Sequence, residues 1–223
     1  MTIIKSISGI RGTIGGKVNQ SLTPIDTVKY AASYGSYLIN KFPNKIINVV
    51  IGRDGRSSGP MIQNLVQNTL IGLGINCIDL GLSTTPTVEI AVINENADGG
   101  IIVSASHNPN NWNALKLLNH KGEFIDYKSG KKIIKLAAKN DFNFCREENI
   151  GKINQNNSYI DIHIDKVVNL SCVNVTLIKN SNFLVVLDGV NSTGGIIIPK
   201  LLNKLGVKCI KLFCDTNKDF PHN

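Results

Sequence analysis

Short apolar runs alternate with segments of helical periodicity along residues 1–140 of the chain. Runs at residues 46–51, 76–80 and 101–104 predict buried strands. Apolar residues spaced three and four positions apart predict helices, at residues 23–42, 60–73, 90–93 and 131–138. Buried strands that alternate with helices form sheets covered on both faces. The pattern therefore predicts an α/β fold, a three-layer α/β/α domain with a mixed, mostly parallel sheet.

Two further patterns predict how this domain ends. Residues 114–118 and a partner near Phe124 predict an antiparallel hairpin at one edge of the sheet. Residues 139–158 turn polar and Asn-rich without periodicity, so we place a domain boundary there. The resulting prediction is one domain over residues 1–150 and the start of a second over 155–223.

The second domain is expected to contain one β-α-β unit. Its predicted parts are a strand at 183–187, a helix at 198–205 and a strand at 207–213, preceded by a helix or strand at 159–170. An open α/β sheet normally has more than two strands with covered faces. We therefore expect this domain to be incomplete and the chain to be truncated.

The net charge of +8 comes from 24 Lys and Arg against 16 Asp and Glu. The lysines scatter and aromatic residues make up 6%, whereas a nucleic-acid binder concentrates basic residues on one face with aromatics between them. A nucleic-acid or anionic-surface binder is thus the weakest of our hypotheses. No apolar run approaches the ~18 residues of a spanning helix, and no signal peptide is visible, so we expect no membrane partner and a cytoplasmic location.

The five cysteines form no C-x-x-C pair and are expected to be reduced core residues. Arginine is scarcer: three of the four arginines, Arg11, Arg53 and Arg56, lie in glycine-bearing segments, predicted as loops at residues 9–13 and 52–59. A third loop, at 104–109, and the loop at 52–59 follow predicted strands, where α/β folds bind ligands. Glycine allows close backbone approach and Arg offers a planar charged fork, which suits a phosphorylated small molecule.

Other interpretations of these loops stay open. Arg53 and Arg56 could be solvated charges on a turn, and Ser-His-Asn-Pro could be a polar turn. The Walker A and dinucleotide fingerprints are absent from the sequence. Ser106 lacks the flanking glycines of a hydrolase nucleophile elbow.

The loop SASHNP at residues 104–109, with NALK at 113–116, resembles the phosphoserine loop of the α-D-phosphohexomutase superfamily, T-x-S-H-N-P followed by N-G-x-K. GIRG at 9–12, GRDGR at 52–56 and FPHN at 220–223 resemble three further family segments in the same order. Two positions depart from the pattern. Ser104 replaces Thr and keeps a hydroxyl, and Ala114 replaces Gly, which is tolerated only where φ is not positive.

The resemblance implies a mutase that moves phosphate between C1 and C6 of a hexose phosphate through a phosphoserine and a hexose 1,6-bisphosphate. It implies phosphoglucosamine, phosphomannose or phosphoglucose substrates, with a slight preference for phosphoglucosamine. The implied catalytic residues are Ser106, Arg11, Lys116 and His107, with Asn108, Arg53, Asp54 and Arg56 in support.

The resemblance also implies Mg²⁺, bound through the phosphate of Ser106 and a D-x-D-x-D/R loop that this sequence lacks. We therefore expect no mutase turnover from the isolated chain. The alternatives are a non-catalytic remnant that binds phosphosugars and an interaction module that pairs with another chain. The oligomeric state is left open.

Overall fold

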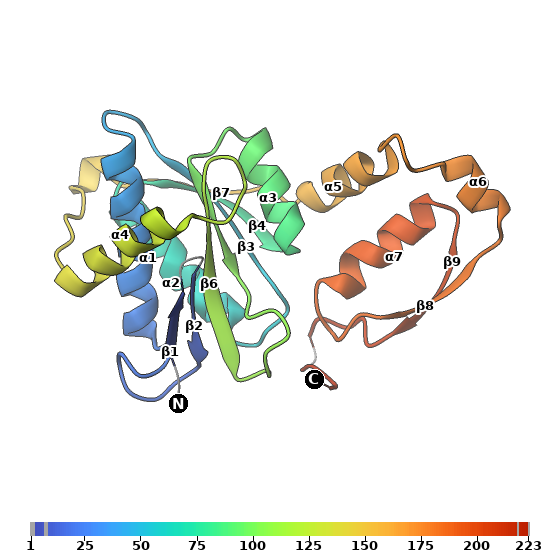
Figure 1. Cartoon of the computed structure of the whole chain (residues 1–223), viewed down its shortest axis with the longest axis horizontal. Helices are drawn as coiled ribbons and strands as arrows, with labels where there is room; N and C mark the ends of the chain where they lie inside the picture. The colour runs from blue at the N-terminus through green and yellow to red at the C-terminus, as the bar shows by residue number, and fades with distance from the viewer. Residues whose placement is uncertain (1–2, 7–8, 218, 223) are drawn as a thin grey trace.

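A seven-stranded sheet with the strand order β1-β2-β6-β5-β3-β4-β7 forms the centre of the larger unit (Figure 1). The computed structural model describes residues 3–6, 9–217 and 219–222. β2, β5, β3, β4 and β7 run in one direction, whereas β1 and β6 run in the other. The predicted mixed, mostly parallel sheet is thus confirmed. The strands are β1 (Ile3–Ser6), β2 (Gly9–Thr13), β3 (Asn48–Arg53), β4 (Asn76–Leu82), β5 (Gly99–Val103), β6 (Trp112–Leu118) and β7 (Ile153–Gln155).

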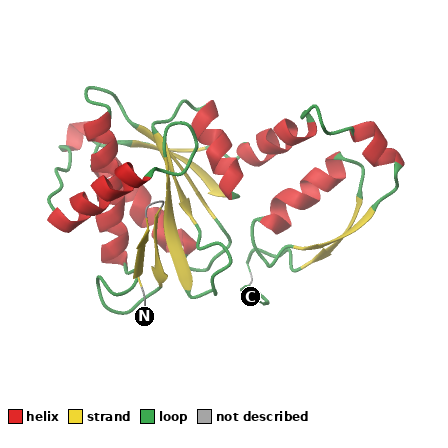
Figure 2. Ribbon diagram, viewed as in Figure 1, coloured by secondary structure: helices red, strands yellow, loops and turns green. Residues whose placement is uncertain are grey.

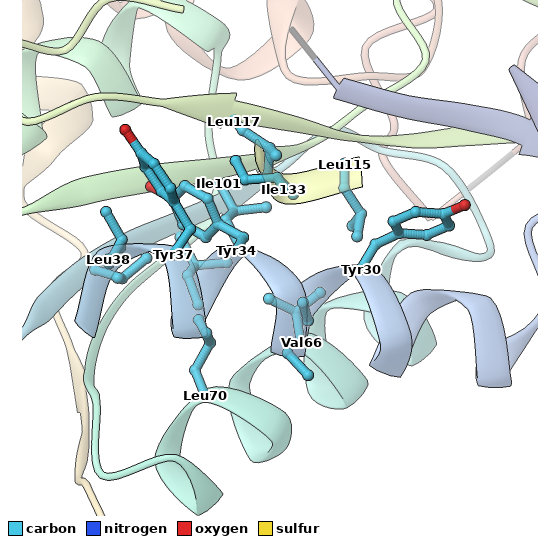
Figure 3. Packing of buried hydrophobic residues seen from close by; sticks show 14 of the residues in the cluster. Tyr30, Tyr34, Tyr37, Leu38, Val66, Leu70, Ile101, Leu115, Leu117 and Ile133 are labelled. Atoms are coloured by element: carbon cyan, nitrogen blue, oxygen red, sulfur yellow. The ribbon is translucent and has the colours of Figure 1, made fainter. Parts of the chain in front are cut away.

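Helices cover both faces of this sheet (Figure 2). Neighbouring residues of β3 separate the faces: Val49 and Ile51 pack into one apolar cluster, whereas Val50 packs into the other. Tyr34 and Leu70 belong to the first cluster, shown in Figure 3. The three-layer prediction is therefore confirmed. The helices are α1 (Pro24–Lys41), α2 (Gly59–Gly72) and α4 (Tyr127–Lys139) at the first cluster and α3 (Thr85–Asn94) at the second.

The start of α1 shows how the sequence sets a helix boundary. The Thr23 hydroxyl accepts a hydrogen bond from the backbone N–H of Asp26, and the Asp26 carboxylate accepts one from the backbone N–H of Thr23. This reciprocal capping satisfies two N–H groups that a helix start otherwise leaves unpaired. Pro24 occupies the first turn, where no N–H is needed. The predicted helix at 23–42 is confirmed.

One local prediction was wrong and a second was right only in part. Residues 9–13 form β2, which pairs with both β1 and β6, and not a loop. Two glycines in five residues favour a loop locally, but two neighbouring strands satisfy the backbone groups. The predicted partner near Phe124 does pair antiparallel with Leu118, and the Asn119 N–H donates to the Glu123 carbonyl at 2.7 Å, but β6 lies inside the sheet and not at its edge. The antiparallel edge of the sheet is instead the β1–β2 hairpin.

The predicted boundary between residues 150 and 155 coincides with the last strand of the sheet. The short 3₁₀ helix η1 (Glu147–Asn149) leads into β7, which pairs in parallel with β4. α5 (Tyr159–Val168) then contributes Tyr159 to the apolar cluster at α3. The chain thus stays attached to the first sheet beyond residue 150.

The smaller unit confirms the predicted β-α-β arrangement. It consists of α6 (Val175–Asn180), β8 (Leu184–Asp188), α7 (Gly194–Lys204) and β9 (Lys208–Leu212), with β8 and β9 parallel. Leu184 and Val186 are each 62% exposed and Ile210 is 48% exposed, so part of this small sheet is uncovered. Among the described helices, none is long and apolar enough to cross a bilayer.

The cysteines correct another expectation. All five thiols are free, but of the five only Cys77 is buried, while Cys172 is exposed. The prediction that they are core residues holds for Cys77 alone. Apolar neighbours in sequence were a poor guide in the smaller unit, because its sheet faces are only partly covered.

Cys77 and Cys172 should differ in reactivity. Burial raises the pKa of Cys77 to about 12, and the thiolate is the reactive form, so we expect iodoacetamide to alkylate native Cys172 at least roughly 100-fold faster. In urea, which unfolds the protein and exposes both thiols, the alkylation rates of Cys77 and Cys172 should become similar. Equal rates in the native protein, measured by peptide mass mapping, would contradict the packing. Because the unfolded thiol ionises near about 8.5, the stability contributed by Cys77 should fall as pH rises above that value.

Candidate functional site

A single buried arginine holds the loop that contains Ser106 in place through hydrogen bonds. Arg56 is 1% exposed, and its guanidinium donates five hydrogen bonds. One reaches the Asp54 carboxylate at 3.1 Å. The other four reach carbonyl oxygens between residues 106 and 112, those of Ser106, Asn108, Pro109 and Trp112, at 2.7–3.0 Å. All five N–H donors of the fork are therefore used, which a lysine could not reproduce.

Ser106 lies just after β5, and its backbone adopts a conformation that non-glycine residues rarely take. Its φ is 59°, in the left-handed region. The Ser104 hydroxyl accepts the Ser106 N–H at 3.1 Å, and the Asn108 side chain donates to the Ala105 carbonyl at 3.0 Å. These bonds fix the backbone while the Ser106 side chain stays exposed. The hydroxyl group of Ser104, which the family's threonine also has, thus accepts a hydrogen bond within the loop.

Two predicted cations meet Ser106 in a cavity of about 310 Å³. β2 and β6 pair with Arg11 opposite Ala114 and Gly9 opposite Lys116. Opposite and alternate residues share one sheet face, so this register places Arg11 and Lys116 on the same face. Both line the cavity with Ser106. Burial lowers the pKa of Lys116, and the charges of Asp54 and Glu89 oppose that effect.

Ala114 satisfies the condition set from the sequence. It lies in β6 with a φ that is not positive, so alanine fits in place of the family's glycine. Asn113 beside it is fully buried and donates to the Ser58 hydroxyl at 2.9 Å, tying β6 to the start of α2. The departure at Ala114 therefore leaves the strand intact.

The remaining predicted residues differ in their closeness to Ser106. His107 Nδ1 lies 3.5 Å from Ser106 Oγ, at the outer limit of a hydrogen bond. Asp54 and His107 line a second cavity with Ser106. Arg53 lines neither cavity; it donates to the Asp54 carbonyl at 3.2 Å, and burial lowers its pKa. The structure thus assembles these residues except Arg53 around the serine.

Sequence reasoning missed the contribution of the smaller unit to this site. The Gly55 N–H donates to Ser192 Oγ at 3.1 Å, and a Cβ at Gly55 would lie only 2.9 Å from the Asn191 carbonyl oxygen. Phe220 stacks on the guanidinium of Arg56 at 5.0 Å. Loops after strands are usual ligand sites in α/β folds, so the loop after β8 carried a usable signal.

The residues near Ser106 do not form a complete magnesium site. The described residues include no group of three His, Cys, Asp or Glu side chains placed to hold a metal. Asp54, the carboxylate in the second cavity, already accepts two N–H bonds from Arg56. Mg²⁺ needs oxygen ligands in near-octahedral geometry, so the residues present do not fit it.

Two family models match the chain. The phosphoglucomutase/phosphomannomutase alpha/beta/alpha domain I model matches residues 3–144, and the corresponding domain II model matches residues 161–223.

Relatives share about a third of the sequence. A probable phosphoglucosamine mutase from Methanosphaera stadtmanae is 34% identical over 98% of this chain and 47% of its own length. A phosphoglucomutase/phosphomannomutase from Thermococcus kodakarensis is 32% identical over 94% of this chain and 46% of its own length. The structure of a putative phosphomannomutase from Thermus thermophilus has a TM-score of 0.81 at 20% identity and covers 97% of this chain and 47% of that one. The chain thus spans about half the length of these relatives.

The fold, the loop that contains Ser106 and the matches to family models and relatives together define an α/β protein of the α-D-phosphohexomutase superfamily. The chain corresponds to an N-terminal part of the members of this superfamily. The domain I model alone covers more than half of the chain. The chain belongs to the phosphoglucomutase/phosphomannomutase family.

Proposed function

We propose that Ser106 of this chain accepts a phosphoryl group from a hexose 1,6-bisphosphate and returns it to a hexose monophosphate. The observation that carries the proposal is the exposed Ser106 side chain on a loop that is held by four hydrogen bonds from Arg56. Phosphoryl transfer requires positioning and charge stabilisation more than covalent assistance.

In the proposed step, Ser106 Oγ bonds to phosphorus while the bond from phosphorus to the sugar oxygen breaks. The serine proton leaves through the adjacent His107 imidazole to solvent, and the released sugar oxygen takes up a proton from water. Arg11 and Lys116, which share the cavity with Ser106, would stabilise the charge on the transferring group. Asn108 and Arg56 hold the loop in position.

The wider proposal is the whole mutase cycle, in which phosphate moves between C1 and C6 of a phosphoglucosamine, phosphomannose or phosphoglucose substrate. The predicted Mg²⁺ would need oxygen ligands beyond the described residues, with phosphorylated Ser106 as the ligand from this chain.

Incubation of the purified chain with glucose 1,6-bisphosphate tests this step. We expect one added phosphoryl group per chain by intact mass, located by fragmentation on the peptide that contains Ser106. Lys116→Ala should lower the rate of incorporation at least roughly tenfold, because it removes a cation worth about 1.4 kcal/mol or more in the transition state. Phosphate incorporation at another residue would contradict the proposal. So would a lack of incorporation under conditions in which a relative's full-length enzyme, the positive control, becomes phosphorylated.

A further inference from the structure

Ser106 also faces the smaller unit, across a cavity of about 490 Å³. This volume falls within the range of roughly 300–1,000 Å³ that is usual for small-molecule sites. From the larger unit it is lined by Ser106 and the loop around it, and from the smaller unit by Val190, Ser192, Thr193, Phe220 and His222. The smaller unit therefore supplies a wall of the serine site.

The loop after β8 is held in an unusual conformation beside this cavity. Val190 and Asn191 have φ values of 48° and 51°, and a β-branched residue is rare in this region. Asp188 Oδ1 accepts the Val190 N–H at 2.9 Å, and the Asn191 side chain donates to the carbonyl of Asp219 at 2.8 Å. Such backbone strain persists only where surrounding contacts enforce it, and it clusters at ligand sites.

His222 is fixed by contacts on two sides. Its Nε2 lies 2.8 Å from Asp188 Oδ2, and its ring meets Phe213 edge-on with the centroids 5.7 Å apart. His222 remains 49% exposed and lines the cavity. The hydrogen bonds from Val190 and His222 hold the pKa of Asp188 below its ordinary value, so Asp188 stays charged.

We propose that His222, oriented by Asp188, is a ligand of the phosphoryl group carried by Ser106. The proposal rests on the proposed phosphorylation of Ser106. The two cavities meet at this serine: Arg11 and Lys116 line one, and His222 lines the other. A phosphoryl group on Ser106 would therefore lie between Arg11 and Lys116 on one side and His222 on the other. The other charged or titratable groups at the His222 side are Asp54, Arg56, His107 and Asp188.

The test uses the full chain with phosphoserine installed at position 106 during translation, so that it does not depend on enzymatic transfer. ³¹P NMR follows the second ionisation of the phosphate with pH. A nearby imidazolium stabilises the dianion, so His222→Gln should raise the phosphate pKa by about 0.5 unit. His120→Gln, at an exposed turn in the larger unit, serves as the matched control and should leave the pKa unchanged.

The same interaction must be visible from the histidine. The imidazole pKa of His222 should be higher in the phosphorylated chain than in the unmodified chain, because the phosphate adds negative charge beside the imidazole. This second measurement uses only the native histidine and does not depend on the folding of a variant. A His222 pKa unmoved by phosphorylation, or equal ³¹P titrations for wild type and His222→Gln, would overturn the proposal. Lack of phosphate uptake from glucose 1,6-bisphosphate would instead reject only the transfer step.

Discussion

Arg56→Ala should destabilise the larger unit by about 3–5 kcal/mol, the cost of removing one partner from a buried, hydrogen-bonded ion pair. The Asp54 carboxylate would lose its charged partner, and four carbonyls of the serine loop would lose their donor. Urea denaturation followed by circular dichroism measures the change. Hydrogen exchange should show lost protection in residues 104–112 before global unfolding.

Two matched variants separate charge from geometry. Arg56→Lys keeps the charge but offers three donors in place of a planar fork, so we expect it to recover less than half of the loss. Arg146→Ala removes an exposed arginine and should change the free energy of unfolding by no more than about 0.5 kcal/mol. A loss below about 1 kcal/mol for Arg56→Ala, or full recovery by lysine, would contradict the bracing role.

The sequence predicted the order of elements well because periodicity is a local property. The strand predicted at 46–51 is observed at 48–53 and the helix predicted at 23–42 is observed at 24–41, and the signals for both lie within or beside the element itself. β2 was missed because its strand character depends on β1 and β6, and β6 lies about a hundred residues further along. The partners of a glycine-rich segment cannot be deduced from the segment alone.

For the candidate site as well, the sequence predicted some features and missed others. The resemblance to the family's motifs implied Ser106, Arg11 and Lys116, and the structure brings them to one cavity. The scarcity of arginine indicated that Arg56 matters, but the four hydrogen bonds that Arg56 donates to one loop could not be deduced from the sequence. The contact between Gly55 and Ser192 joins residues 137 positions apart, so the sequence did not show that the loop after β8 meets the Ser106 site.

Ser106→Gly should abolish phosphate incorporation and at the same time stabilise the protein. The left-handed conformation at Ser106 costs a residue with a side chain about 1–2 kcal/mol, and glycine's greater chain entropy costs about 0.5–1 kcal/mol. The backbone N–H and carbonyl of residue 106 make the bonds to Ser104 and Arg56, so glycine keeps both. We expect the free energy of unfolding to rise by roughly 0.5–1 kcal/mol, measured by urea titration.

Two controls decide whether the strain and the chemistry belong to the same residue. Ser106→Ala removes the hydroxyl but keeps a Cβ at φ 59°, so incorporation should be lost with no gain in stability. Asn140→Gly changes a left-handed residue at the end of α4, far from the motif in sequence, and should leave incorporation unchanged. Undiminished incorporation in Ser106→Gly would show that another residue is the acceptor. Reduced stability of Ser106→Gly would show that the backbone at Ser106 is unstrained. The left-handed conformation would then not account for how the hydroxyl is held exposed.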